Sequence, residues 1–280
     1  MSVLLISPDG MLGHAFELAL AGRSDRHRGV KFPEVDLRDE ASVARALGDR
    51  PKLVINCAAY TDVDAAETHE DDASAVNGLG VGVLGRACAS IGATLVHFGT
   101  DYVFSGDAST PYPIDAPIAP RTAYGRSKAM GETLLRESGA DHLLVRTSWL
   151  YAPWGKNFVR TIAKAASERD ALRVVNDQRG RPTSAEGLVT TTLALLDAGA
   201  RGTFHGSDSG ECTWFELAQH IVSETKARAR VEPCTTEEFP RPAPRPRYSV
   251  FDLAATHARV APAPPWQAAV SDVLGRLSPF

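Results

Sequence analysis

The chain has 280 residues, which is enough for one large α/β domain or a main domain with a smaller second lobe. Its content of 44% hydrophobic and 23% charged residues is ordinary for a folded globular protein, and its net charge of −4 argues against binding nucleic acid through phosphate neutralisation. The four cysteines and eight histidines are scattered, so reduced cysteines and no metal site are expected. No apolar run reaches the length of a membrane helix and no leader pattern precedes the first strand, so we expect a cytoplasmic protein.

Short apolar runs alternate with segments of helical period through the first half of the chain. Strands are predicted at 3–7, 29–32, 52–58, 94–99 and 142–148, with a short strand position at 36–39 and helices over 11–22, 73–91 and 122–138. This alternation is typical of βαβ units, and continuous apolar strands indicate that both faces of the sheet are covered. The predicted fold class is therefore α/β, with a doubly wound parallel sheet of the Rossmann type.

The second half is less regular and contains a stretch rich in proline. Helices are predicted near 156–168, 184–198, 213–227 and 266–277, with strands near 172–176 and 202–206. The PRPAPRPR stretch at 240–247 cannot be helical, so it should lie as a loop over the surface or the mouth of a cleft. We expect residues 1–150 to form the NAD(P)-binding core, with returning segments from the second half, and residues 151–280 to form mainly a smaller substrate-binding lobe.

The turn after the first strand carries two glycines of a phosphate-binding loop. Gly10 and Gly13 stand three residues apart and open the first helix, where glycine lets the backbone approach a pyrophosphate. Ser7 stands where such a loop usually has its first glycine, and Pro8 follows it. An ordinary βα turn would explain the two glycines equally well.

The residues after the predicted second strand bear on the choice of cofactor. No acidic residue stands at its end to bind a ribose 2′-hydroxyl, whereas Lys31 and Arg28 stand where a 2′-phosphate would fit. This pattern favours NADPH over NADH, with NADH possible. Arg26 and Arg28 would also be explained as solvated surface charges.

A second pattern joins a tyrosine and a lysine on one helix face. Tyr124 and Lys128 are four residues apart, so an ammonium group can lie beside the phenol, stabilise the phenolate and lower the pKa of the tyrosine. Thr100 ends a buried strand earlier in the chain and could hold a reacting carbonyl oxygen. A tyrosine and lysine at this spacing occur often by chance. Together with the nucleotide loop and the threonine they predict proton-transfer chemistry.

Several motifs in order resemble the extended short-chain dehydrogenases/reductases and, within them, the dTDP-4-dehydrorhamnose reductase family. The motifs are GMLG (10–13), NCAAYTDVDAAE (56–67), the helix with Asn77, GTDYVFSG (99–106), YGRSK (124–128), RTSWLY (146–151), NFVRTI (157–162), NDQRGRPTSA (176–185) and RPRYS (245–249). They span almost the whole chain. The resemblance implies a reductase that passes hydride from NADPH or NADH to the 4-keto group of dTDP-4-dehydro-L-rhamnose, giving dTDP-L-rhamnose.

The resemblance also implies roles for individual residues. Tyr124 would be the general acid, Lys128 would tune Tyr124 and bind the nicotinamide ribose, and Thr100 would bind the carbonyl oxygen. Cofactor contacts would come from Gly10, Met11, Leu12, Asp36, Leu37, Ala58, Ala59, Tyr60, Tyr124 and Lys128. Substrate contacts would come from Val63, Thr100, Asp101, Tyr102 and Trp149, with Asn157, Arg181 and Arg245 on the side of the nucleotide diphosphate.

Some relatives with this pattern join two subunits through a magnesium ion held by carboxylates. The three aligned positions here are Ala15, Glu186 and Arg276, of which only Glu186 is acidic, so no metal-bridged dimer is predicted. A monomer or a homodimer is expected, with a small nucleotide sugar as substrate and neither nucleic acid nor a membrane as partner.

Two alternatives to this reductase stay open. One is a reductase of another nucleotide-linked 4-keto-6-deoxysugar. The other is a nucleotide-binding regulatory subunit without catalysis, similar to the subunit associated with methionine adenosyltransferase. The presence of Thr100, Tyr124 and Lys128 argues against the second.

Overall fold

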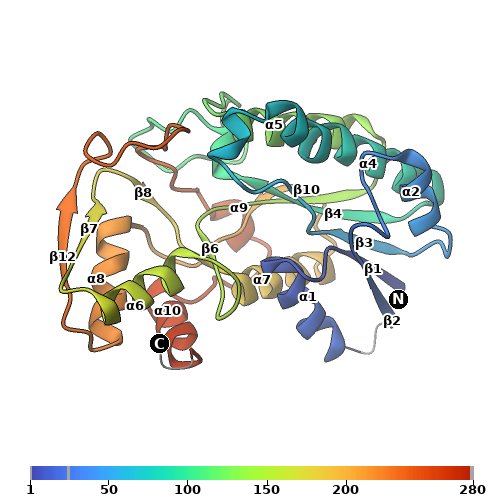
Figure 1. Cartoon of the computed structure of the whole chain (residues 1–280). Coiled ribbons are helices and arrows are strands. Elements are labelled where there is room, and N and C mark those ends of the chain that lie inside the picture. Colours follow the sequence, from blue (N-terminus) through green and yellow to red (C-terminus); the bar gives the residue numbers. More distant parts are fainter. Residues whose placement is uncertain (1, 24–25, 278–280) are drawn as a thin grey trace.

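The centre of the protein is one parallel sheet with the predicted doubly wound connections (Figure 1). The computed structural model describes residues 2–23 and 26–277. The strands of the sheet are β1 (Ser2–Ile6), β2 (Arg26–Val30), β3 (Leu53–Asn56), β4 (Thr94–Thr100), β5 (His142–Thr147) and β10 (Gly202–His205). They lie in the order β10-β5-β4-β3-β1-β2, and every neighbouring pair is parallel. Since the chain leaves β1 first to one side and then to the other, the order reverses between β1 and β3, where such sheets bind ligands.

Helices cover both faces of this sheet (Figure 1), which explains why its central strands β1, β3, β4 and β5 are buried, mostly apolar runs. One face packs against α1 (Met11–Ala21) and α7 (Ala185–Asp197), and the other against α2 (Glu40–Ala46), α4 (Gly80–Ile91) and α5 (Ala123–Glu137). Along the four central strands side chains alternate between the two cores, with Leu5 in the first and Leu4 in the second. The fold class predicted from the sequence is confirmed.

Three details within residues 26–46 differ from the sequence prediction. Residues 36–39 form a turn instead of a strand, because Asp36 accepts hydrogen bonds from both the backbone and the side chain of Arg38. Strand β2 begins at Arg26, three residues before the predicted start, and the short helix α2 was not predicted.

The predicted helix at 73–91 is divided by a wider turn. It consists of α3 (Glu70–Ser74), the π-helical turn η2 (Ala75–Leu79) and α4. A Cβ atom on Gly131 of α5 would lie 2.0 Å from the carbonyl oxygen of Asn77, so the two backbones approach closely at this turn. Hydropathy cannot distinguish such a turn from a continuous helix, but turns of this kind are frequent at functional sites.

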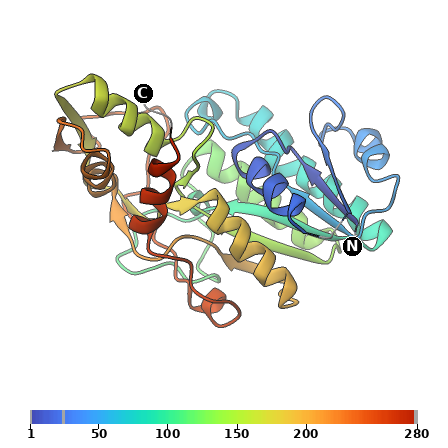
Figure 2. The ribbon, with the colours of Figure 1, turned by 90° about the horizontal axis from the view of Figure 1, so that it is seen from below.

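A second unit, here called the small lobe, has its own core (Figure 2). It contains α6 (Phe158–Glu168), α8 (Trp214–Glu224), α10 (Trp266–Gly275), the parallel pair β7 (Ala171–Val175) with β12 (Arg230–Cys234), and two short pairs, β6 (Leu150–Tyr151) with β9 (Thr183–Ser184) and β8 (Arg179–Gly180) with β11 (Cys212–Thr213). Two elements from this half of the chain, α7 and β10, instead complete the main sheet layer.

The remaining elements are short and connect the two units. They are η1 (Ala65–Glu67), η3 (Asp101–Val103) and α9 (Ala254–His257). The proline-rich stretch 240–247 contains no helix, as predicted, and Asp64 binds it by accepting hydrogen bonds from Arg241 and from the backbone of Ala243. Within residues 2–23 and 26–277, no helix has both the length and the apolar character needed to cross a bilayer.

Candidate active site

A cavity of about 510 Å³ lies at the carboxyl ends of β1, β3, β4 and β5. This main cavity is lined by Ser7, Gly10, Met11, Leu12, Asn56, Cys57, Ala58, Ala59, Thr61, Val63, His97, Phe98, Gly99, Thr100, Asp101, Tyr102, Tyr124, Lys128, Thr147, Ser148, Trp149, Leu150 and Lys156. Its volume is in the range of cofactor and ligand sites, and it stands at the reversal of strand order where α/β sheets bind ligands.

The loop between β1 and α1 has the conformation of a phosphate-binding turn. Ser7 has a φ of +62°, in the left-handed region that favours glycine, so the serine adopts the conformation that the missing glycine would adopt. A Cβ on Gly13 would lie 1.9 Å from the Ser7 carbonyl oxygen, which makes glycine necessary there. A Cβ on Gly10 would meet only Ser7 atoms at 3.6 and 3.9 Å, so its open side faces the cavity.

Helix α5 places both predicted proton-transfer residues in the main cavity. The side chain of Thr122 caps the helix by accepting a hydrogen bond from the Gly125 amide, and Tyr124 and Lys128 follow on one face. The Lys128 ammonium donates to the carbonyl oxygen of Phe98 on β4 at 2.6 Å. Thr100 ends the same strand, its hydroxyl donates to the carboxylate of Asp101 at 3.1 Å, and it lines the same cavity, so all three predicted residues meet there.

Burial determines the electrostatics of this group. Burial, with a smaller contribution from the charge of Asp101 and against an opposing one from the Thr100 hydroxyl, raises the pKa of Tyr124 to about 12. Lys128 is not among the groups that shift the pKa of Tyr124 here, so its lowering of that pKa stays a prediction. Burial also lowers the pKa of Lys128 to about 8, against the opposing charge of Glu132, and raises the pKa of Asp101 to about 6.

The loop after β3 is fixed to α5 through Asn77. The Asn77 side chain accepts from the Tyr60 amide at 2.8 Å and donates to the Tyr60 carbonyl at 2.9 Å and to the Ser127 hydroxyl at 3.0 Å. These three hydrogen bonds hold the loop with Ala58 and Ala59 along the wall of the cavity, where small side chains leave room for a ligand. The π-helical turn presents Asn77 for this purpose.

Other predicted site residues lie outside the cavity wall and have internal partners. Leu37 is buried in the core, Asn157 caps α6, and Arg181 donates to the carbonyls of Phe251 and Gly210. Asp36, Tyr60 and Arg245 are also outside the wall, bound to Arg38, Asn77 and Asp64 respectively.

Two buried polar atoms in the wall were not predicted. The Asn56 amide, oriented by accepting a bond from Ala58, lies 3.2 Å from Nδ1 of His97 and donates to it. Burial lowers the pKa of His97 well below its usual value, so the ring is neutral and its proton is on Nε2. That N–H and the Thr147 hydroxyl lack partners among the described residues. A histidine inside the apolar run TLVHFG was the available sequence signal.

Arg28 and Lys31, two basic residues in and after β2, have different partners. The guanidinium of Arg28 donates to the Ala46 carbonyl and to Asp49, both at 2.8 Å, so the interpretation of Arg28 as a phosphate ligand is not supported. The ammonium of Lys31 lies 3.6 Å from the carboxylate of Asp9 in the phosphate loop, and both side chains are about half exposed. Lys31 thus stands beside the loop and can be drawn to an anion there.

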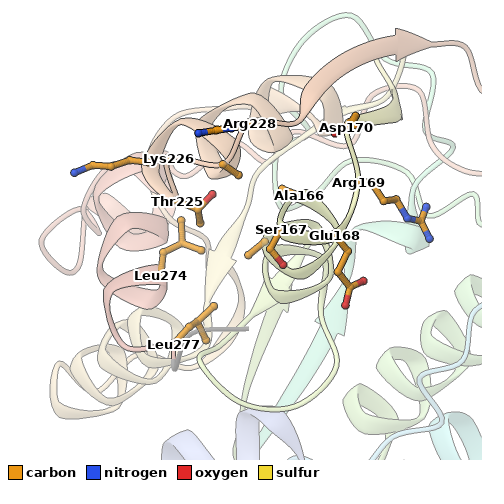
Figure 3. Close-up of a pocket in the computed structure, with 12 residues that line it drawn as sticks. Ala166, Ser167, Glu168, Arg169, Asp170, Thr225, Lys226, Arg228, Leu274 and Leu277 are labelled. Carbon is orange, nitrogen blue, oxygen red and sulfur yellow. The ribbon is translucent and has the colours of Figure 1, made fainter.

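A second cavity, of about 570 Å³, lies in the small lobe at the carboxyl ends of α6, α8 and α10 (Figure 3). Its wall includes the apolar side chains of Leu274 and Leu277 and the exposed charged side chains of Glu168, Lys226 and Arg228. It contains none of the predicted site residues, so the catalytic chemistry is assigned to the main cavity.

Two of the three positions considered above for a metal bridge, Glu186 and Arg276, form an ion pair. Arg276 donates to both carboxylate oxygens of Glu186, and its guanidinium lies 6.0 Å from the centre of the Trp154 ring. Within the part of the chain that the structure describes, no cluster of three or more metal-ligating side chains is found.

The sheet order and the position of the cavity define a nucleotide-binding protein of the Rossmann class. The chain belongs to the family described as RmlD substrate binding domain, whose model matches residues 1–278. A dTDP-4-dehydrorhamnose reductase of Burkholderia thailandensis is 38% identical over 96% of this chain and 97% of its own length. A probable dTDP-4,6-dihydroxy-2-methyloxan-3-one 4-ketoreductase of Streptomyces antibioticus is 40% identical over 90% and 86%.

Solved structures agree with this assignment. A dTDP-4-dehydrorhamnose reductase of Bacillus anthracis, in complex with NADP, has a TM-score of 0.94 at 34% identity and covers 97% of this chain and 98% of its own. The agreement extends over both the main sheet and the small lobe.

Proposed function

We propose that this protein reduces the 4-keto group of dTDP-4-dehydro-L-rhamnose with NADPH, giving dTDP-L-rhamnose. The observation that carries the proposal is the meeting of Thr100, Tyr124 and Lys128 in one cavity that also contains the phosphate loop. A subunit that only binds nucleotide would have no use for this arrangement. The names of the relatives from Burkholderia and Bacillus support the same substrate class.

The residues of the main cavity fit a dinucleotide. The amino end of α1 starts at Gly10, which has no side chain to occupy the space before the first amides, so the loop can hold a pyrophosphate. The N–H of His97 and the hydroxyl of Thr147, which have no partner within residues 2–23 and 26–277, can serve polar groups of the ligand inside the wall. When bound, NADPH would supply the hydride. NADH could replace it where the 2′-phosphate contributes little.

The protein's own residues would then donate one proton to the carbonyl oxygen and stabilise the negative charge that develops on it. Tyr124 donates its phenolic proton to the carbonyl oxygen as that oxygen becomes an alkoxide, and its raised pKa keeps the phenol protonated beforehand. Thr100 donates to the same oxygen, where charge grows in the transition state. Lys128, fixed by the Phe98 carbonyl, holds a positive charge close by and binds the ribose hydroxyls.

The sugar would lie between η3 and the segment after β5. Val63, Asp101, Tyr102 and Trp149 line this part of the cavity. Lys156, exposed and on the same wall, is a further candidate for the diphosphate, because a lysine ammonium suits a phosphate group. The alternative substrate, another dTDP-linked 4-ketosugar, has one specific support: the Streptomyces antibioticus relative is named as such a ketoreductase.

The test is a direct assay of the purified full chain. Enzymatically prepared dTDP-4-dehydro-L-rhamnose is added with NADPH or NADH, the loss of reduced nicotinamide is followed by absorbance, and the product is identified by NMR. We expect oxidation of NADPH and formation of dTDP-L-rhamnose. Turnover only with a different dTDP-4-ketosugar would favour the alternative, and no turnover with any of them would reject a reductase.

A further inference from the structure

We propose that Trp214 is a positioning residue that, together with Gly180, clamps the indole of Trp149 so that only the edge of this ring borders the sugar-binding part of the main cavity. The inference rests on the proposed function, because it concerns how the same site recognises a dTDP-linked sugar. Neither Trp214 nor Gly180 lines the cavity itself.

The first observation is a near-parallel stack of two tryptophans. The ring centres of Trp149 and Trp214 are 3.5 Å apart with an interplanar angle of 8°. At this separation the rings are in van der Waals contact with little lateral offset, so Trp214 covers one whole face of Trp149. Face-on stacking of a ligand on that side is excluded.

The other face of Trp149 is covered by Gly180. A Cβ added there would lie 2.6, 2.7 and 2.8 Å from three atoms of the Trp149 ring, Cε2, Cζ2 and Nε1, which places the glycine over the plane of the ring. The space on the Trp214 side is already filled, so Gly180 must lie on the opposite side. With both faces covered, the indole presents its edge to the cavity.

Trp214 and Gly180 both belong to the small lobe and are linked by one strand pair. Cys212 and Thr213 of β11 pair with Gly180 and Arg179 of β8, and Trp214 follows Thr213 directly. The distance between Gly180 and Trp214 is therefore set by the antiparallel pairing of β8 with β11. Thr213 and Glu216 form a reciprocal capping box at the start of α8, which fixes the direction in which Trp214 leaves the helix.

The clamped residue itself lies in the segment that leads from the main sheet to the small lobe. Trp149 lies two residues after Thr147, the last residue of β5, and has a φ of +48°. A bulky side chain is unfavourable in this left-handed region, so the conformation persists only because the surroundings hold it. Phe158 supports the stack from behind, with its ring centre 4.5 Å from that of Trp214. The orientation of the Trp149 ring in the cavity therefore depends on its contacts with residues of the small lobe.

Three variants test the clamp, and each is compared with wild type. Trp214→Leu removes the ring that stacks on Trp149, and Trp214→Phe keeps a flat aromatic ring there. Gly180→Ala adds a methyl group that presses on the Trp149 indole from the opposite side. Binding of dTDP-L-rhamnose is measured by calorimetry, kcat and KM by the reductase assay, and the affinity for NADPH by fluorescence titration. Far-UV circular dichroism reports the Trp149–Trp214 pair, since the strong far-UV transitions of two closely packed indoles give an exciton couplet.

We expect Trp214→Leu and Gly180→Ala to raise the KM and the Kd for the dTDP sugar by about tenfold or more, while kcat and the Kd for NADPH stay within about threefold of wild type. Trp214→Leu should lose the couplet, and Trp214→Phe should recover most of the sugar affinity. A general loss of structure would weaken NADPH binding in parallel with sugar binding, and that outcome would overturn the proposal.

Two negative results are distinguishable. If wild type neither binds nor reduces any dTDP sugar, the proposed function fails. If wild type binds the sugar and Trp214→Leu binds it equally well although the couplet has gone, the clamp alone is wrong.

Discussion

The two sides of the main cavity are built in different ways. On the side of the main sheet, residues such as Asn56 and Thr100 stand at the ends of neighbouring parallel strands, so the hydrogen-bonded ladder itself brings them together. On the side of the small lobe, Trp149 is held in place by Trp214 and Gly180, and Arg245 is held outside the wall by Asp64. Backbone pairing places the first set, whereas side-chain packing over long sequence distances places the second.

This difference predicts where function should be sensitive. Residues at strand ends can be exchanged for close analogues without moving the backbone, so their variants should lose chemistry and keep binding. Residues on the side of the small lobe depend on their neighbours, so their variants should change affinity for the sugar more than turnover.

The largest effect is expected at the tyrosine on the main-sheet side. Tyr124→Phe removes the phenolic proton but keeps the ring and its edge contact with Tyr102. We expect turnover to fall by about 10²–10⁴-fold, with the Kd for NADPH changed by less than about threefold. Rapid-mixing kinetics and fluorescence titration measure the two quantities. If the Tyr124→Phe variant remains fully active, Tyr124 is not the general acid.

A second effect should appear as a pH dependence of NADPH binding. Burial lowers the pKa of Lys128 from 10.5 to about 8, so the free protein loses this positive charge as the pH rises through that value. The affinity for NADPH should therefore be constant below pH about 7 and weaken above pH about 8.

A matched variant separates this titration from other groups. Lys128→Arg keeps a positive charge throughout this range, so its NADPH affinity should not fall above pH about 8. Fluorescence titrations at a series of pH values give both curves. A wild-type affinity that is unchanged up to pH about 10 would contradict the assignment.

A smaller effect is expected on the choice of cofactor. Lys31 lies beside the phosphate loop, whereas Arg28 is bound to Asp49 and to the Ala46 carbonyl on the far side. Lys31→Glu should shift the ratio of NADPH to NADH affinities by about tenfold towards NADH, because it replaces an attraction for the 2′-phosphate by a repulsion. Arg28→Ala is the matched control and should leave the ratio unchanged. An equal response of both variants would mean that the 2′-phosphate lies nearer to Asp49 than the sheet order implies.

The sequence predicted the main-sheet side well for a physical reason. Continuous apolar runs identify buried parallel strands, and the spacing of Tyr124 and Lys128 places both on one face of a helix, so Thr100 and this pair could be assigned to one end of the sheet. The turn at 36–39 was missed because it depends on side-chain bonds between Asp36 and Arg38. Hydrophobicity does not report such bonds.

The other side could not be predicted from local patterns. The contact of Trp149 with Trp214 joins residues 65 positions apart in the chain, and nothing local marks Trp214 as the partner. Arg181 and Arg245 have the residue type that suits a diphosphate, yet each is engaged by groups that only the folded chain brings near. Residue type predicts what a side chain can bind, but not what already occupies it.

The smallest effect concerns Ser7, which stands in place of the first loop glycine. Ser7→Gly relieves the left-handed conformation at φ +62°, worth about 1 kcal/mol, but it also increases the conformational entropy of the unfolded chain by a similar amount. The free energy of unfolding, measured by chemical denaturation, should therefore change by less than about 1 kcal/mol. Because Ser7 already has the glycine-like backbone and Gly13 keeps its contact with the Ser7 carbonyl, the Kd for NADPH should change by less than about threefold. A tightening of more than about tenfold would show instead that the serine side chain, which donates to Asp9 at 3.3 Å, holds the loop away from its best position for the pyrophosphate.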